Sequence, residues 1–402
     1  MSISVLDRAS VGNFRRSCWD TVLTSGTKEI TKRQLFDREE YQMRSRSSLN
    51  ALAAAVALTA LMPHGAQAQS TGEPLRVIFA GAVNNVPMMV AAENGYWREL
   101  GLDVSVQVLD SGSQIARALV SGAADIGAGA ATSTVILSRA AGNDLTLIGP
   151  YHNNPMVVNG VQRVAVIARN EAGVTDKNPG DIVGKTVGVT AGSTGESYLR
   201  SYLSSIGKTL EDIKMVNLSP PDMSVALQQG TVDVAVPWEP YVSQIIRTQG
   251  NDVSVVSRGG PFGASVVGVM VTDDYLQKHR DLVEKYVLGA WKGVKFTREH
   301  PAEAAELAQR YIQGVDPQDA TSAIEFMKSE FDPRISVCTE AAILQEQKAQ
   351  IAAGNMKVDE PFPYDQIVQK AFINDLLQKH PDLTSGLAPL PQAVEQCGGG
   401  TN

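Results

Sequence analysis

The chain has 402 residues, of which 43% are hydrophobic, and its 35 basic and 43 acidic side chains give a net charge of −8. Without residues 1–68, a predicted leader, 334 residues remain, with 26 basic and 37 acidic side chains and a net charge of −11. This acidity argues against nucleic acid or an anionic membrane as a main partner, and the length suits two domains.

The N-terminal segment predicts export. Arg44 and Arg46 follow Met43, an apolar run covers residues 49–62, and Ala66-Gln67-Ala68 precedes Gln69. This is the order of a cleaved Sec signal peptide, predicted at 43–68, and it places the mature protein in the periplasm. The apolar run is too short for a comfortable membrane span, so no membrane insertion is expected. Residues 1–42 are predicted to be a non-native or disordered extension, or else an unusually long basic region of the signal.

Strands and helices alternate through the mature chain. Strands are predicted at 75–80, 102–109, 125–128 and 145–151, with helices at 87–100, 114–121 and 133–140. The pattern restarts with strands at 163–168, 186–190, 213–218, 232–236 and 253–257, and helices at 194–206, 223–229 and 239–250. Such alternation indicates an α/β fold built from βαβ units, with a parallel sheet covered on both faces.

The last third is mostly helical. One apolar strand at 266–271 precedes predicted helices at 281–298, 302–312, 317–328, 339–353 and 364–378. A strand that follows a complete inserted unit suggests that one lobe is discontinuous. We therefore expect lobe 1 at 75–162 and 263–385, lobe 2 at 163–262, a ligand cleft between them, and a flexible tail at 386–402.

Four turns between a strand and a helix are candidate ligand sites. In open α/β sheets, ligands bind beyond the carboxyl ends of the strands, where helix N-termini present free N–H groups and a partial positive charge. Small or hydroxyl-bearing residues let the backbone approach an anion there. Each hydroxyl is equally explained as a helix cap. The candidate residues are Asn84, Asn85, Val86, Pro87, Ser111, Gly112, Ser113, Ala131, Thr132, Ser133, Gly192, Ser193, Thr194 and Gly195.

Two further features stand apart from these turns. Trp238 and Glu239 follow the strand predicted at 232–236, where an aromatic ring can pack on a ligand; filling the edge of the lobe is the alternative. Cys338 and Cys397 are the two cysteines of the mature chain, and a disulfide between them is one of two open possibilities. None of the candidate turns contains Lys or Arg, which favours a small monoanionic or zwitterionic organic ligand over a multivalent anion.

Motifs for catalysis are weak. The sequence has no H-E-x-x-H, C-x-x-C or G-x-S-x-G, so no metal, cofactor or hydrolytic triad is expected. Gly180 to Thr186 resembles a phosphate loop, but it is one residue short between the glycines and precedes a strand. We therefore predict a binding protein with no catalytic residues.

Several segments carry a family resemblance. They are residues 91–97, 118–127, 184–189 and 232–241, the last reading Val-Asp-Val-Ala-Val-Pro-Trp-Glu-Pro-Tyr. With them the chain resembles the nitrate/sulfonate/taurine-type family of periplasmic solute-binding proteins of ABC importers over about residues 75–385. The resemblance implies a type II periplasmic-binding-protein fold, a monomer, and an ABC permease with its ATPase as partners. It also implies that the turns above and Trp238 hold the ligand.

Two other classes stay open. Enzymes that make thiamine-pyrimidine precursors, and dehydratases, resemble the same architecture; a ligand-sensing protein for a membrane receptor is the third possibility.

Overall fold

The computed structural model describes residues 72–158, 163–259, 266–312, 315–352 and 354–398. Residues 70–402 form one compact unit. The predicted signal peptide at 43–68 and the predicted extension at 1–42 lie outside the described residues. Within the described ranges, none of the helices combines the length and the apolar character needed to cross a bilayer.

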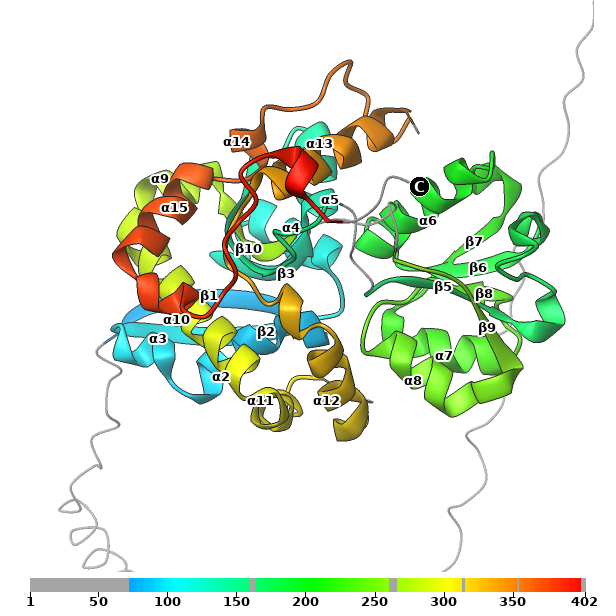
Figure 1. Cartoon of the computed structure of the whole chain (residues 1–402), viewed down its shortest axis with the longest axis horizontal. Helices are drawn as coiled ribbons and strands as arrows, with labels where there is room; N and C mark the ends of the chain where they lie inside the picture. The colour runs from blue at the N-terminus through cyan, green and yellow to red at the C-terminus, as the bar shows by residue number, and fades with distance from the viewer. Residues whose placement is uncertain (1–71, 159–162, 260–265, 313–314, 353, 399–402) are drawn as a thin grey trace, which may run out of the picture. The chain divides into compact units, whose positions relative to one another are not determined.

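The first of two sheets combines four strands that precede the second sheet in the sequence with one, β10, that follows it (Figure 1). Its order is β2-β1-β3-β10-β4, with bounds β1 Glu73–Ala80, β2 Leu102–Leu109, β3 Ile126–Ala131, β4 Leu145–Asn153 and β10 Val266–Thr272. β1 is parallel to β2 and β3, whereas β10 is antiparallel to β3 and β4. We call this sheet and the helices on it the first lobe.

The second sheet repeats this plan. Its order is β7-β6-β8-β5-β9, with bounds β5 Ala165–Arg169, β6 Thr186–Val189, β7 Lys214–Asn217, β8 Val234–Ala235 and β9 Val253–Arg258. β6 is parallel to β7 and β8, and β5 is antiparallel to β8 and β9. The parallel pairing predicted from the βαβ pattern is present in both sheets, but each sheet is mixed, because β10 and β5 pair antiparallel with their neighbours. We call this sheet and its helices the second lobe.

The lobe boundaries predicted near residues 162 and 262 fall at or inside the undescribed segments and stay predictions. Helices fill the connections in both lobes, and several follow one another after β10. They are α2 Val86–Glu93, α3 Tyr96–Glu99, α4 Gly112–Val120, α5 Thr132–Ala140, α6 Thr194–Ser205, α7 Pro220–Gln228, α8 Tyr241–Gln249, α9 Asp273–Lys278, α10 Arg280–Glu299, α11 Pro301–Ala308, α12 Pro317–Phe326, α13 Val337–Ala352, α14 Tyr364–Ile367 and α15 Lys370–Lys379.

Two predicted helices are each broken into two. The helix predicted at 87–100 stops at Glu93 and restarts at Tyr96, because Gly95 between them has φ +72°. The helix predicted at 364–378 is interrupted at Val368, which instead forms a bridge to Leu147 of β4. In both cases the apolar residues keep a helical spacing across the break, so the sequence pattern does not show that the helix is interrupted.

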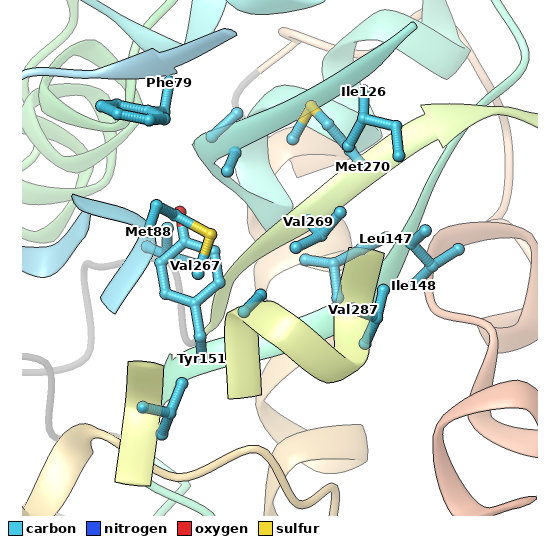
Figure 2. Close-up of a cluster of buried hydrophobic side chains, with 14 of the residues drawn as sticks. Phe79, Met88, Ile126, Leu147, Ile148, Tyr151, Val267, Val269, Met270 and Val287 are labelled. Atoms are coloured by element: carbon cyan, nitrogen blue, oxygen red, sulfur yellow. The ribbon is translucent and has the colours of Figure 1, made fainter. Parts of the chain in front are cut away.

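The core of the first lobe lies between the β10–β4 pair and α10 (Figure 2). Val269 of β10, Leu147 of β4 and Val287 of α10 are fully buried there. Glycine is required on α10, because a Cβ on Gly293 would lie 2.0 Å from the carbonyl oxygen of Pro87. This close approach fixes α10 against α2 and holds the turn before α2 in place.

The C-terminal segment is tied to the first lobe. Cys338 at the start of α13 forms a disulfide with Cys397, across 59 residues of sequence. The Gly398 N–H donates to the Met156 carbonyl at 2.7 Å, and the Val158 N–H donates to the Gly398 carbonyl at 3.2 Å. Residues 386–398 were expected to be a flexible tail; the structure instead anchors the end of this segment beside residues 156–158.

Candidate functional site

A pocket with about 370 Å³ of empty space, part of it open to solvent, lies where the two lobes meet. It is lined by Ala80, Ala82, Asn84, Gly112, Gly129, Arg163, Ser193, Thr194, Trp238 and Val267. Five of these belong to the predicted ligand turns or the predicted aromatic lip: Asn84, Gly112, Ser193, Thr194 and Trp238. The pocket therefore joins predicted positions from both lobes.

Two helices begin at the pocket. α4 starts at Gly112 from the first lobe, and α6 starts at Thr194 from the second. Ser111 caps α4 by accepting from the Gln114 N–H, and Ser193 caps α6 by accepting from the N–H groups of Gly195 and Glu196. These two hydroxyls thus act as helix caps, while the partial positive charge of both helix ends faces the same space.

The lobes touch beside these helix ends. The Ser113 hydroxyl donates to the Ala191 carbonyl at 3.2 Å, and the Tyr241 hydroxyl donates to the Gly81 carbonyl at 3.3 Å. Farther out, Arg247 of α8 makes three hydrogen bonds of 2.8 to 3.0 Å with Asp319 of α12. The side chain of Asp319 is 7% exposed. These contacts hold the lobes together around the pocket.

Arg163 lies on the pocket lining but was not among the residues predicted from the sequence. It is 4% exposed and lines the pocket. Burial lowers the pKa of its guanidinium, and the carboxyl groups of Glu330 and Glu346 partly offset this. A signal was available, since Arg163 is the sole Lys, Arg, Asp or Glu between Asp144 and Arg169. A lone charge in an uncharged stretch at the predicted boundary between the lobes should have been weighed as a ligand contact.

Arg163 is held by a buried chain of polar groups. It donates from Nη1 to His152 Nδ1 at 3.2 Å. His152 Nε2, which then carries the hydrogen, has Met327 Sδ as its hydrogen-bond partner at 3.3 Å. The same nitrogen lies 3.2 Å from Oε2 of Glu330 in the 3₁₀ turn Lys328–Glu330, an oxygen that makes no hydrogen bond. Burial, and then the charge of Arg163, lower the pKa of His152 well below 6.5, so its ring is neutral at physiological pH. The histidine thus orients the guanidinium without adding charge.

A second buried carboxyl faces Arg163 from α13. Glu346 Oε2 accepts from the Thr132 hydroxyl at 2.8 Å, at the start of α5. Burial raises the pKa of Glu346 to about 7, and burial raises that of Glu330 to about 7 as well. The buried guanidinium of Arg163 therefore lies near two carboxyl groups whose pKa values are both about 7.

Trp238 and Glu239 have separate roles. Trp238 is 8% exposed, lines the pocket, and bridges to Val164 beside Arg163. Glu239 is 1% exposed and points to neighbours of its own lobe, pairing with Arg258 and accepting from the Ser243 hydroxyl at 3.0 Å. Trp238 therefore lines the pocket, whereas Glu239 makes its contacts within the second lobe.

Other predicted site residues lie outside the pocket lining. Asn85 is fully buried, donates to the Ala80 carbonyl at 2.7 Å and accepts from Tyr151 at 2.6 Å, so it braces the turn beneath Asn84. The rest are buried, except for the exposed Gly192: Val86, Pro87, Ser111, Ser113, Ala131, Thr132, Ser133, Gly192 and Gly195. Gly192 contributes a backbone N–H to Glu196 at 2.7 Å.

Among the described residues, no group of three or more His, Cys, Asp and Glu side chains is placed to hold a metal ion. The pocket brings together a buried guanidinium, two helix N-termini, an amide and an aromatic wall. Such a site can bind and orient a small anion with an apolar or polar body.

Comparison with known proteins identifies the family and the fold. Residues 82–304 match the family described as NMT1/THI5 like. The taurine-binding periplasmic protein of Escherichia coli (strain K12) is 30% identical over 247 residues, 61% of this chain and 70% of the relative. A Bacillus subtilis (strain 168) protein named for binding aliphatic sulfonates is 24% identical over 300 residues, 73% of this chain and 86% of the relative.

A solved structure has the same fold. The alkanesulfonate-binding protein SsuA from Xanthomonas axonopodis pv. citri, bound to MOPS, superposes with a TM-score of 0.59 at 18% identity, covering 71% of this chain and 94% of that chain. The chain therefore belongs to the NMT1/THI5-like family and has the periplasmic-binding-protein fold of the solute-binding proteins of ABC importers.

Proposed function

We propose that this protein captures a small organosulfonate in the periplasm and delivers it to the permease of an ABC importer. The observation that carries the proposal is the buried Arg163 at the pocket, between the N-termini of α4 and α6. A sulfonate is a tetrahedral monoanion with three acceptor oxygens. The planar guanidinium fork binds two of them, and helix N–H groups stabilise the charge.

The remaining surface suits the organic part of the ligand. Trp238 of the second lobe and Ala82 of the first lobe give apolar surface, while Asn84 of the first lobe offers an amide. The relatives named for taurine and for aliphatic sulfonates support this ligand class. Residues from both lobes contact one ligand, so binding favours the closed arrangement of a two-state hinge equilibrium.

Isothermal titration calorimetry tests the proposal with a panel of alkanesulfonates, nitrate, sulfate and carboxylates. We expect sulfonates to bind most tightly. Arg163→Gln should weaken sulfonate binding by about a hundredfold, because it removes a buried charge-assisted pair. Trp238→Ala should weaken it less. Arg139→Gln is the matched control, since the Arg139 side chain is only 8% exposed but pairs with Asp273.

Two results would oppose this function. Sulfonate affinity that is equal in wild type and Arg163→Gln would remove Arg163 from the site. Mass spectrometry of the ligand after incubation and release should recover it unchanged; conversion would replace capture by catalysis.

A further inference from the structure

The carboxyl groups of Glu330 and Glu346 act on Arg163 from outside the pocket lining. We propose that this pair is the counterion of Arg163 in the ligand-free site, and that an anion bound to Arg163 replaces it, so that the pair takes up a proton from the solvent. Anion capture is then linked to proton uptake and weakens as pH rises. This inference rests on the part of the proposed function in which an anion binds at Arg163, and it holds for any such anion.

Two segments that follow β10 in the chain bring the carboxyl groups to Arg163. Glu330 ends the 3₁₀ turn Lys328–Glu330, and its Oε2 lies 3.2 Å from Nε2 of His152, whose Nδ1 accepts from Arg163. Glu346 is on α13, where its Oε2 accepts from the hydroxyl of Thr132. Arg163 thus lines the pocket, while the groups that balance its charge are held by other elements.

Each carboxyl group has one oxygen that is poorly stabilised as an anion. Among the described residues, Oε2 of Glu330 and Oε1 of Glu346 are buried and make no hydrogen bond. A buried charge without hydrogen bonds costs far more than a neutral group does. Burial accordingly raises the pKa of both groups to about 7, and the charge of Arg163 opposes this rise in both. The protonation of the pair therefore depends on whether the charge of Arg163 is available to it.

A bound anion removes the charge that keeps the pair ionised. At about pH 8 the ligand-free site holds one cation and two largely ionised carboxyl groups. An anion on the guanidinium adds a further negative charge, so the site returns towards balance when the pair takes up a proton. Because the two groups interact with the same cation, the proton belongs to the pair and to neither residue alone. At about pH 6 the pair is already largely protonated, so binding takes up little.

The other buried titratable groups on the packed elements stay neutral. Burial raises the pKa of Tyr151 on β4. Burial, more than the charge of Arg163, lowers the pKa of His152 well below 6.5, so the loss of that charge does not protonate the ring near neutrality. On α6 and α14, burial likewise raises the pKa of Tyr198, Tyr202 and Tyr364.

The charged side chains on the neighbouring elements have partners of their own. Arg298 of α10 donates to the carbonyls of Phe331 and Leu383. The remaining groups form ion pairs that exclude Arg163, Glu330 and Glu346: Lys328 with Glu325, Asp332 with Arg334, Glu340 with Lys370, Arg139 with Asp273, Glu196 with Arg200, and Arg247 with Asp319. Glu330 and Glu346 are therefore the groups whose protonation an anion at Arg163 changes.

Isothermal titration calorimetry with ethanesulfonate measures the linkage. Titrations in two amine buffers of different ionisation enthalpy give the number of protons taken up, and amine buffers do not compete as anions. Wild type should take up about 0.5 to 1 proton at about pH 8 and almost none at about pH 6, and its affinity should fall about five- to tenfold between these pH values. Ethanesulfonate has no group that titrates in this range.

The double variant Glu330→Gln/Glu346→Gln tests the assignment to the pair. It should take up almost no proton at about pH 8, and its affinity should change less than about twofold from pH 6 to pH 8. Glu340→Gln is the matched control, because Glu340 is on the same helix as Glu346 but pairs with Lys370. It should keep the wild-type proton number and pH dependence.

The possible failures are distinguishable. Uptake by wild type of less than about 0.2 proton at about pH 8 would overturn the linkage, and this measurement needs no variant. Uptake that persists in the double variant would overturn the assignment to Glu330 and Glu346. If no sulfonate binds, the proposed function fails, and the same proton count with nitrate or sulfate decides the linkage separately. Absence of binding by any of these anions would overturn both.

Discussion

The stability of the ligand-free protein should depend on pH through the neighbours of Arg163. Burial raises the pKa of Glu330 and of Glu346 to about 7, so the folded state holds their protons more tightly than the unfolded chain does. The stability that each contributes is complete below its unfolded pKa of about 4.5 and is lost as pH rises through about 7. From about pH 5 to about pH 8 the loss is about 2.5 kcal/mol for each carboxyl.

His152 acts in the opposite direction. Its pKa is lowered well below 6.5, so at low pH the unfolded chain binds a proton that the folded state does not. Folding stability therefore rises by about 2 kcal/mol as pH increases from about 5 to about 8. Together the three groups predict a net loss of about 3 kcal/mol for wild type, and a gain of about 2 kcal/mol for the double variant Glu330→Gln/Glu346→Gln.

Urea denaturation followed by tryptophan fluorescence measures these changes at four pH values across that range. Asp125 and Asp233 do not interfere, because their pKa values are lowered and their contributions are lost only as pH falls below about 4. Glu340→Gln should keep the wild-type slope. If the free energy of unfolding changes with pH in the same direction in wild type and the double variant, Glu330 and Glu346 do not dominate the pH dependence of stability.

Three further predictions concern the scaffold. Replacing Cys338 and Cys397 by Ser should lower the free energy of unfolding by about 4 kcal/mol, from the 59-residue separation that the bond closes; unchanged urea midpoints would contradict this. Gly293→Ala should lower Tm through an overpacking cost of about 1–3 kcal/mol, whereas Gly180→Ala, where nothing lies within 4 Å, should not; equal Tm values would oppose this view of α10. Arg247→Ala should weaken ligand binding severalfold and increase the radius of gyration in X-ray scattering, since it breaks the pair with Asp319; Arg76→Ala, which breaks a pair inside the first lobe, should do neither.

Local chemistry predicted much of the fold and part of the site. Strand and helix alternation located most elements, and strand-to-helix turns located Asn84, Gly112, Ser193 and Thr194 on the pocket lining. These signals are local, because a helix end must be capped and a strand end must turn. Strand direction is not local, so the antiparallel pairing of β10 and β5 could not be read from periodicity.

The charged residues at the site could not be predicted from local sequence. Arg163 is a single charged residue at the predicted boundary between the lobes. Glu330 and Glu346 lie more than 160 residues further along the chain. No local motif surrounds any of the three residues. They come together because the 3₁₀ turn Lys328–Glu330 and α13 pack on the first lobe. Long-range packing that places isolated charges together leaves no pattern in a short window of sequence.

The place of β10 has a consequence for how the molecule is made. β10 lies between β3 and β4 and is the strand that connects them, yet it follows the whole second sheet in the chain. A nascent chain that stops before Val266 would have β4 without a neighbour in its sheet and one side of β3 unpaired. The first lobe can therefore be completed only after the second has been synthesised, and until then its sheet offers open edges to other chains. Premature termination within the second lobe should yield aggregation instead of a smaller folded domain.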